Sequence, residues 1–222
     1  MPSKLEKFAE VNTLNNFHEL VYESLTEGFA NKGKWHSAVF NNENPIVLEL
    51  GCGKGEYSVG LAEKNPHKNY IGVDIKGNRI WTGAKIALEK NLTNAHFLRT
   101  KIDFIDHCFE KQEVSEIWIT FPDPQPQKSR ARQRLTNARF LNRYKQILKT
   151  DGLVHLKTDS TLMYEYTLEV INEEKHQLLF ATDNLYQNCP ADRQELISIK
   201  THYEKLFTDK GEDIKYCSFQ LK

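Results

Sequence analysis

The sequence predicts a doubly wound α/β fold built on a mostly parallel, seven-stranded, Rossmann-like sheet. Three observations lead to this prediction. From residue 45 onward, short β-branched or apolar runs alternate with helical patterns, which is typical of a parallel sheet with helices on both faces. A glycine-rich turn follows the first run. Two strand-like segments near the C-terminus allow a hairpin, and hence one antiparallel strand.

The expected strands are short and rich in β-branched and aromatic residues. They are Pro45–Leu50, Asn69–Asp74, a strand at Phe97 and Leu98, Ser115–Phe121, Leu153–Thr158, Gln177–Thr182 and Ile214–Leu221. The helical patterns between them have apolar residues at helical spacing. They are Tyr57–Lys64, Gly77–Lys90, Thr136–Lys149 with Thr136 as a candidate N-cap, Thr161–Ile171 and Glu195–Phe207.

The chain is expected to divide at residue 44. Its 222 residues suit one ordinary domain with a short appendage. Residues 1–44 form an N-terminal extension with one helical pattern, Phe17–Phe29, and residues 45–222 form the α/β domain.

Composition excludes several classes of protein. A hydrophobic fraction of 39% with 27% charged residues is globular and not disordered. No run approaches the roughly 20 apolar residues that span a bilayer, and the N-terminus lacks the apolar core of a secretory signal. The four cysteines form no CxxC pair, so we expect reduced thiols in a cytoplasmic protein. The eight histidines are too scattered for a helix-borne metal site, and no metal is expected.

The charge distribution is uneven although the formal net charge is zero. Residues 124–150 contain eight lysines and arginines and no acid, so the rest of the chain carries eight net negative charges. A solvated helix face is the ordinary explanation for a charge run, but such faces usually mix both signs. A block of one sign favours a polyanionic partner.

The first strand leads directly into Glu49-Leu50-Gly51-Cys52-Gly53-Lys54-Gly55. Gly51, Gly53 and Gly55 let the backbone approach a ligand at a helix N-terminus. A dinucleotide loop would need glycine at position 56, and Glu56 there would lie close to a pyrophosphate. With Glu49 two residues ahead of the loop, the pattern suits a ligand that carries an ammonium and a sulfonium. S-adenosyl-L-methionine is such a ligand.

Two further acids follow the next strands. Asp74 ends the second strand, where a carboxylate is placed to accept hydrogen bonds from both ribose hydroxyls of a nucleoside cofactor. Asp103 follows the third strand. It is placed either to reach the adenine or to cap a helix, and the sequence leaves both open.

Asp123 lies between Pro122 and Pro124 where the fourth strand ends. Each proline fixes its own φ and biases the preceding residue toward extended conformations. Ligands of open α/β sheets bind at the carboxyl ends of strands, so we expect Asp123 in a stiff loop beside the cofactor's methyl group. A plain turn is the alternative, but it does not explain why this acid precedes a basic stretch.

Several motifs occur together in a fixed order. They are Glu-Leu-Gly-Cys-Gly-Lys-Gly-Glu, the strand end Gly72-Val73-Asp74, Phe-Pro-Asp-Pro, Lys157-Thr158-Asp159 and Thr201-His202-Tyr203-Glu204. From about residue 45 to residue 207 the chain resembles the bacterial tRNA (guanine-N7-)-methyltransferases, which have the class I methyltransferase fold. The glycine loop is shared by many methyltransferases, whereas the last three motifs are specific to this family.

The resemblance implies methyl transfer from S-adenosylmethionine to N7 of the variable-loop guanine at position 46 of tRNA. It places Glu49, Asp74, Asp103 and Asp123 at the methyl donor, with Asp123 also as the catalytic aspartate. It places Asp159, Thr201, Tyr203 and Glu204 at the guanine or the tRNA. Two positions depart from the family: Gln125 replaces the usual tryptophan and Gln127 the usual lysine. Either Lys128 takes over the role of that lysine or the contact is lost.

The chemistry agrees with these residues. Guanine N7 has an in-plane lone pair and no proton, so its attack on a sulfonium methyl needs no general base. The enzyme must align the reactants and place negative charge near the developing purine cation, as Asp123 can. The basic stretch would hold tRNA phosphates without reading sequence. Its arginines are Arg130, Arg132, Arg134, Arg139 and Arg143.

Other functions remain as alternatives. Methyltransferases of exocyclic amino groups use an Asp/Asn-Pro-Pro-aromatic loop at the same strand end, but here Gln125 and Pro126 follow Pro124. A non-catalytic tRNA-binding protein on the same fold would not need the intact acids, and a nicotinamide enzyme is disfavoured by Glu56. Among the remaining residues, Trp81, Trp118 and His155 are expected to be buried. Trp35 would either contact RNA or pack on the domain.

Overall fold

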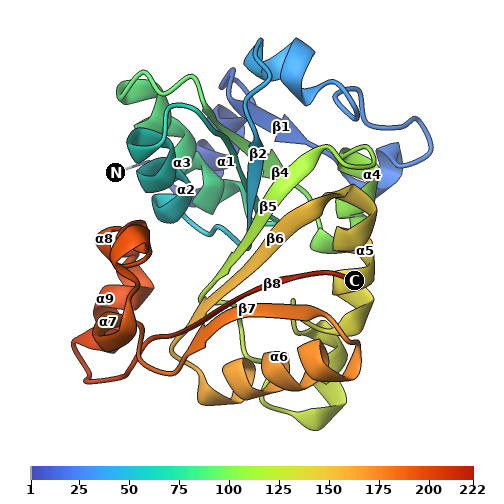
Figure 1. Cartoon of the computed structure of the whole chain (residues 1–222). Helices are drawn as coiled ribbons and strands as arrows, with labels where there is room; N and C mark the ends of the chain where they lie inside the picture. The colour runs from blue at the N-terminus through green and yellow to red at the C-terminus, as the bar shows by residue number, and fades with distance from the viewer. Residues whose placement is uncertain (1) are drawn as a thin grey trace.

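The computed structural model describes residues 2–222 and shows a sheet with helices on both faces (Figure 1). Within these residues the sheet has eight strands in the order β1-β4-β3-β2-β5-β6-β8-β7. Strand β8 runs antiparallel to β6 and β7, and the other pairs are parallel. The strands are β1 Phe17–Glu19, β2 Ile46–Leu50, β3 Asn69–Asp74, β4 Ala95–Arg99, β5 Val114–Thr120, β6 Leu148–Thr158, β7 Gln177–Thr182 and β8 Lys215–Gln220. The predicted fold class is confirmed, with one strand more than expected.

The helices follow the strands in the alternation that the sequence predicts. The α-helices are α1 Lys4–Val11, α2 Glu56–Lys64, α3 Gly77–Glu89, α4 Ile105–Cys108, α5 Ala138–Ile147, α6 Thr161–Glu173, α7 Leu185–Asn188, α8 Glu195–Ser198 and α9 His202–Thr208. Short 3-10 helices lie at η1 Tyr22–Ser24, η3 Ile102–Phe104, η4 Lys128–Gln133 and η5 Ala191–Arg193, and η2 Trp35–Phe40 is a π-helix.

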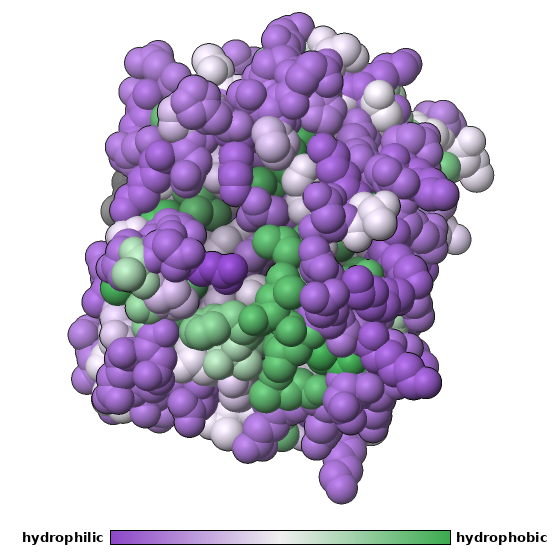
Figure 2. All heavy atoms as spheres, viewed as in Figure 1, coloured by the Kyte–Doolittle hydropathy of each residue, from purple (hydrophilic) through white to green (hydrophobic). Residues whose placement is uncertain are grey.

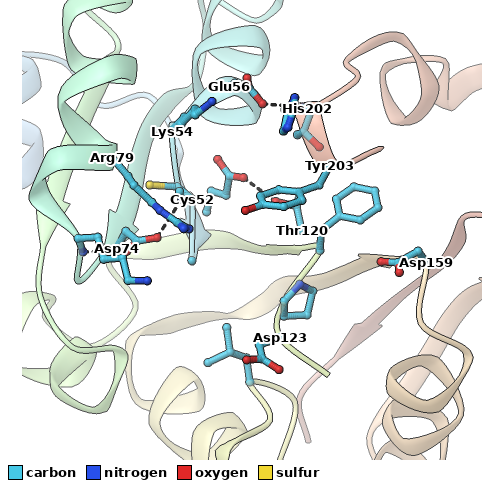
Figure 3. A pocket seen from close by; sticks show the side chains of 18 of the residues that line it. Cys52, Lys54, Glu56, Asp74, Arg79, Thr120, Asp123, Asp159, His202 and Tyr203 are labelled. Carbon is cyan, nitrogen blue, oxygen red and sulfur yellow. Dashed lines mark hydrogen bonds between the residues drawn. The ribbon is translucent and has the colours of Figure 1, made fainter. Parts of the chain in front are cut away.

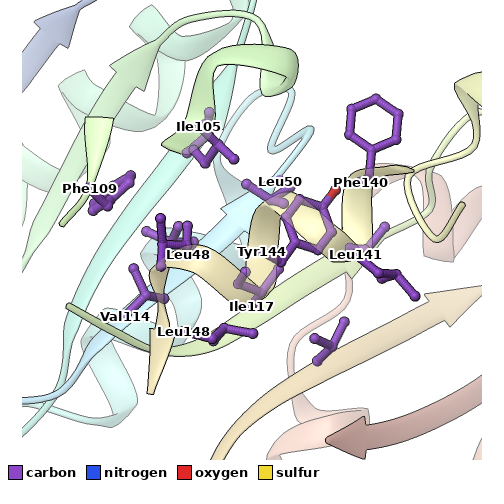
Figure 4. Close-up of a cluster of buried hydrophobic side chains, with 14 of the residues drawn as sticks. Leu48, Leu50, Ile105, Phe109, Val114, Ile117, Phe140, Leu141, Tyr144 and Leu148 are labelled. Carbon is purple, nitrogen blue, oxygen red and sulfur yellow. The ribbon is translucent and has the colours of Figure 1, made fainter. Parts of the chain in front are cut away.

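Side chains of the central strands alternate between two hydrophobic clusters, because successive residues of a strand face opposite sides of the sheet. Leu48 and Leu50 of β2 join the first cluster with side chains of α4, α5 and α6 (Figure 4). Val47, which precedes Leu48, joins the second cluster with side chains of α1, α2, α3 and α8. Glu49 shares the face of Val47, so the β2 pattern brings this acid to the side where α2 begins.

The helix predicted over Phe17–Phe29 is wrong. Residues Phe17–Glu19 form β1, which pairs with β4, and the 3-10 helix Tyr22–Ser24 follows. Tertiary contacts override the helical pattern: buried Asn16 donates from Nδ2 to the carbonyl oxygens of Ala84 and Ala95, at 3.1 and 3.4 Å. The helix of this region lies earlier, at α1, where Ser3 and Glu6 form a capping box.

Two other helices have different bounds from those predicted. Helix α5 begins at Ala138, because Asn137 and not Thr136 is its N-cap, and Thr136 is buried against the hydroxyl of Thr167 at 2.7 Å. The helix expected over Glu195–Phe207 is two helices, α8 and α9. The chain extends at Ile199 between them, and Thr201 caps α9 by accepting from the amide of Glu204 at 3.1 Å.

The aromatic residues singled out in the sequence lie mostly in the core. Trp118 and His155 are buried, as predicted, and their rings stack with centroids 4.0 Å apart. Trp35 is also buried and donates from Nε1 to the carbonyl of Cys108 at 2.9 Å, so it packs on the domain. Trp81 is only partly buried and donates to Glu10 of α1 at 3.0 Å. The division of the chain at residue 44 stays a prediction.

Hydrophilic side chains cover most of the face drawn in Figure 2, and hydrophobic side chains gather near its middle. The edge strand β7 carries two exposed leucines, Leu178 and Leu179, which are 45% and 40% exposed. Among residues 2–222, no helix combines the length and the apolar character that crossing a bilayer requires.

Candidate functional site

The carboxyl ends of β2, β3, β5 and β6 meet at one edge of the sheet, and a cavity of about 750 Å³ opens there (Figure 3). Helices α2, α3 and α9 supply further walls. This is the edge at which open α/β sheets bind ligands. The predicted site residues that line it are Glu49, Gly51, Gly53, Asp74, Asp123, Asp159, Thr201 and Tyr203.

Two glycines of the loop after β2 have different roles. Gly53 has φ +56°, and a Cβ there would meet no atom within 4 Å, so a ligand can approach its backbone from the open side. Gly55 has φ +71° and is the N-cap of α2, and its Cβ would lie 2.4 Å from Cε1 of Phe97. Gly55 therefore serves the packing of α2 and does not line the cavity.

Glu49 is buried below this loop, and both of its carboxylate oxygens accept hydrogen bonds. Oε2 accepts from the amide and the hydroxyl of Ser58 at 2.9 and 2.5 Å, and Oε1 accepts from the hydroxyl of Thr120 at 2.6 Å. Burial raises the pKa of Glu49 to about 7, because these hydrogen bonds only partly offset the loss of solvent. The nearby charge of Asp74 raises the pKa further.

Asp74 is positioned by the backbone on both sides. Its Oδ2 accepts from the amide of Gly53 at 2.9 Å and its Oδ1 from the amide of Lys76 at 2.8 Å. Each oxygen keeps a further lone pair that these bonds do not use, and Asp74 lines the cavity. Cationic side chains of Lys54, Lys76 and Arg79 also line this end of the cavity (Figure 3).

Asp123 is exposed in the loop after β5. The residues on either side of the Pro-Asp-Pro run are left-handed, with φ +47° at Phe121 and φ +45° at Gln125. Non-glycine residues adopt this conformation only where the surroundings enforce it. The amide of Gln125 donates to Oδ1 of Asp123 at 3.0 Å. Phe121 precedes Pro122 and is nevertheless left-handed, so the extended backbone that Pro122 favours is not adopted at this residue. The stiffness expected of the loop stays a prediction.

The opposite wall is formed by Asp159 after β6 and by the start of α9. Burial raises the pKa of Asp159. Tyr203 is 46% exposed and its ring lies in the cavity (Figure 3). The amide of His202 donates to Oε2 of Glu56 at 2.6 Å, which joins the start of α9 to the start of α2.

Glu204 does not line the cavity. It is fully buried, and its Oε1 lies 2.7 Å from Nζ of Lys157 and accepts from the hydroxyl of Tyr186 at 2.8 Å. Lys157 also donates to the carbonyl of Leu196 at 2.5 Å. Burial lowers the pKa of Lys157, and the carboxylate of Glu204 opposes that effect. Glu204 therefore anchors α9 to the core and does not face a substrate in the cavity.

Three other predicted residues, Asp103, Arg139 and Arg143, also lie outside the cavity with their charges engaged. Asp103 belongs to η3, whose N-cap is Lys101, and its Oδ1 lies 2.6 Å from Nη1 of Arg139. Arg143 pairs with both oxygens of Asp106 at 2.8 Å. The position of Asp103 agrees neither with a helix cap nor with a group that lines this cavity.

The basic segment divides into exposed and buried side chains. Gln127, Lys128, Arg130 and Arg132 are exposed on or beside η4. Arg134 is only 6% exposed and donates to the carbonyl oxygens of Pro124 and Gln125. Its guanidinium faces the protein, which disfavours the predicted contact of Arg134 with phosphate.

Some residues of the site were not singled out in the sequence. The hydroxyl of Thr120 donates to Glu49. The sequence feature that could have revealed Thr120 is a hydroxyl residue directly after an apolar strand run. Phe121 and Phe207 line the cavity with rings stacked 6.2 Å apart, although 86 positions separate them in the sequence. No local pattern predicts such a pair. Among residues 2–222, no group of three or more His, Cys, Asp or Glu side chains is arranged to hold a metal ion.

Comparison with solved structures supports the fold. The 16S rRNA methyltransferase KamB superposes with a TM-score of 0.61 at 14% identity, covering 83% of this chain and 91% of that one. A geranyl diphosphate methyltransferase in complex with GPP and sinefungin gives a TM-score of 0.53 at 14% identity, covering 80% and 72%. At such identities the likeness concerns the fold alone.

Comparison of sequences is more specific. A family model described as "Putative methyltransferase" matches residues 43–217. The tRNA (guanine-N(7)-)-methyltransferase of Christiangramia forsetii is 50% identical over 221 residues, covering 99% of this chain and 98% of that protein. The protein of the same name from Bacteroides thetaiotaomicron is 48% identical, covering 99% and 86%, and that of Listeria monocytogenes serovar 1/2a is 37% identical, covering 86% of each. The chain therefore belongs to the tRNA (guanine-N(7)-)-methyltransferase family.

Proposed function

We propose that this chain transfers a methyl group from S-adenosyl-L-methionine to N7 of a guanine in tRNA, at position 46 of the variable loop. The observation that carries the proposal is the meeting of Glu49, Asp74 and Asp123 around one cavity beside an exposed basic segment. The family membership of the chain supports the same reaction.

The cavity has the features that the methyl donor needs. Asp74 has lone pairs free for two ribose hydroxyls. Glu49 lies below the glycine loop, where the cationic end of the donor would favour its ionised form, and Gly53 leaves the room for close approach. Once bound, S-adenosylmethionine supplies an electrophilic methyl group on a sulfonium.

The protein's part in the chemistry is alignment and electrostatic stabilisation. Guanine N7 needs no general base, because its lone pair is free at neutral pH. The purine ring becomes cationic as the new bond forms, and the exposed, backbone-oriented carboxylate of Asp123 is placed to stabilise that charge. A carboxylate that is fixed before the reaction stabilises the transition state without reorganising.

The target guanine would lie between Asp123 and the wall formed by Asp159 and Tyr203. Asp159 can accept hydrogen bonds from guanine N1–H and the 2-amino group, and adenine lacks this pair of donors. The exposed ring of Tyr203 offers a face on which the base can stack. Thr201 adds a polar contact at the same wall, in addition to its role as the cap of α9.

The tRNA backbone would be held by Lys128, Arg130 and Arg132, which are exposed on η4 just after the Asp123 loop. Contacts of this kind fix the position of the RNA and not the sequence that is read. Lys128 takes the place of the family lysine in this arrangement, because Gln127 has no charge.

The test is transfer of labelled methyl to an unmodified tRNA transcript, beside a transcript whose variable-loop guanine is adenine. Label on the first only, recovered as 7-methylguanosine, is the expected result. Label on both transcripts would show that the target is another nucleotide. Label recovered on an exocyclic amino group would show that the methylated atom is not N7. Binding of S-adenosylmethionine without transfer to either transcript would contradict tRNA as substrate.

A further inference from the structure

The side chain of Arg134 connects three parts of the chain at the back of the Asp123 loop. Its Nε donates to the carbonyl of Pro124 at 3.0 Å and its Nη2 to the carbonyl of Gln125 at 3.1 Å. Its guanidinium lies over the ring of Tyr166 in α6, 4.4 Å from the centroid. The hydroxyl of Tyr166 accepts in turn from Nδ2 of Asn137 at 2.6 Å, so the ring is held in place.

These contacts differ from those of its neighbours in the basic segment. Arg130 and Arg132 are exposed, whereas Arg134 is 6% exposed. Within residues 2–222 no carboxylate lies within ion-pair distance of Arg134, so carbonyl oxygens and an aromatic face are its polar partners. A guanidinium suits this place because it is planar, has several donors and stacks on rings, which an ammonium does not.

The loop that Arg134 holds needs such support. Phe121 and Gln125 are both left-handed, a conformation that non-glycine residues leave when nothing enforces it. The amide of Phe121 donates to the carbonyl of Lys157 at 2.8 Å and fixes the start of the loop. Arg134 fixes its end, at the residue whose amide orients the carboxylate of Asp123.

We infer that Arg134 is a positioning residue, which holds the loop so that the carboxylate of Asp123 faces the reacting atoms. It would act through the loop and not by contact with tRNA. The inference rests on the proposed function in one of its two measurements, the turnover of methyl transfer. The other measurement, the ordering of the loop, needs no substrate.

The test compares Arg134→Lys and Arg134→Ala with the matched surface variant Arg132→Ala. The lysine variant keeps the charge that a phosphate contact would need but cannot bridge two carbonyl groups and stack. We expect kcat of both Arg134 variants at saturating tRNA to fall about 100-fold, the size of effect that small misplacements produce. The salt dependence of tRNA affinity should stay at its original slope. In Arg132→Ala we expect the salt slope of tRNA affinity to be lower by about 1. The variant expected to leave kcat unchanged is Lys64→Ala, an exposed change at the end of α2 and outside the cavity.

Amide hydrogen exchange over residues 119–127 provides the second measurement. We expect faster exchange in both Arg134 variants and unchanged exchange in Arg132→Ala. Full turnover of Arg134→Lys, or exchange in the loop equal to that of the original protein, would overturn the inference. If the original protein itself transfers no methyl group, the proposed function fails, and the exchange comparison still decides the role of Arg134. Should Arg134→Ala not fold, Arg134→Lys and Tyr166→Leu give the same comparison.

Discussion

The carboxylates of the cavity are held in different ways, and this difference decides how each responds to change. Glu49 is buried with three hydrogen bonds to Ser58 and Thr120. Asp123 is exposed, with one hydrogen bond from the amide of Gln125. Burial raises the pKa of Glu49 to about 7, so the charge of this residue depends on pH near neutrality.

Glu49 should make cofactor binding dependent on pH. Its pKa is raised from 4.5 to about 7 by burial, so it is mostly neutral below pH 7 and anionic above. A cationic ligand prefers the anion, and we expect the affinity for S-adenosylmethionine to fall by up to about tenfold per pH unit below 7. Calorimetric titrations between pH 5.5 and 7.5 measure this. Glu49→Gln is the control, and an equal pH dependence in that variant would exclude Glu49 as the cause.

The raised pKa of Glu49 also affects the stability of the fold, which favours the protonated form, whereas the ligand favours the anion. Because the folded pKa lies above the unfolded value of 4.5, the folded protein binds the proton more tightly. The contribution of Glu49 to the free energy of unfolding therefore decreases as pH rises from about 4.5 to 7. Bound S-adenosylmethionine should reduce this loss, since it favours the ionised form.

Asp123→Asn should lower kcat by at least about 100-fold, as removal of one charge-stabilising group does in other enzymes. The asparagine oxygen can still accept from Gln125, so the melting temperature should not change. Initial rates at saturating tRNA and a thermal melt measure both effects. Asp151→Asn, at an exposed position on β6, is the matched control. Near-normal turnover of Asp123→Asn would show that the charge of Asp123 does not stabilise the transition state.

Short elements around the cavity depend on contacts that are distant in sequence, and here prediction from sequence was least successful. Strands β2, β3 and β5 were predicted to within one residue at each end because their apolar pattern is strong and local, whereas β6 begins five residues earlier than predicted. Helix α9 starts where Thr201 caps it and Glu204 anchors it to Lys157, and a sequence pattern does not show such an anchor. Asp103 was assigned by its place after the third strand and Arg134 by its place in the basic stretch, yet each is engaged elsewhere in the fold.

The buried pair of Lys157 and Glu204 should stabilise α9 strongly. Glu204→Ala leaves Lys157 buried without its anion, and we expect a loss of about 3–5 kcal/mol in the free energy of unfolding. Denaturant unfolding measures it. A double variant, Lys157→Met with Glu204→Leu, should regain part of the loss, because it leaves no unpaired charge. Weaker tRNA binding by Glu204→Ala at unchanged stability would instead indicate a direct substrate contact.

The 3-10 helix η4 should carry much of the salt-dependent affinity for tRNA. We expect replacement of Lys128, Arg130 and Arg132 by glutamine to weaken binding and to lower the salt slope by about 2–3, near 0.7–0.9 per phosphate contact. Filter binding at several salt concentrations measures the slope. Replacement of Lys64 and Lys175, both exposed and outside the basic stretch of residues 124–150, is the control. An unchanged slope in the triple variant would place the tRNA contacts elsewhere.

Across the molecule, the N-terminal segment is joined to the sheet and not merely appended to it. Strand β1 extends the sheet beyond β4, and α1 packs on α3 through contacts such as that between Glu10 and Trp81. Asn16, just before β1, ties this segment to α3 and β4, since its side chain donates to the carbonyls of Ala84 and Ala95. A local helical pattern over residues 17–29 could not reveal this role.

Asn16→Ala should therefore destabilise the whole fold and not only the first residues. It leaves buried carbonyl groups with fewer partners, and we expect a loss of about 1–3 kcal/mol in the free energy of unfolding. Chemical denaturation followed by tryptophan fluorescence reports on the buried Trp35 and Trp118. Asn12→Ala, an exposed change in the same segment, is the control. The expectation would be contradicted if Asn16→Ala left the free energy of unfolding unchanged and only speeded amide hydrogen exchange in residues 2–20.

The two outer strands of the sheet also determine how the protein behaves at high concentration. A free strand edge is a template on which other chains can add. Strand β1 has only three residues, and β7 has an irregular register between Leu178 and Phe180. A short strand on one side and a broken ladder on the other leave little straight backbone for another copy to join. We therefore expect little edge-to-edge association, although Leu178 and Leu179 are open to water.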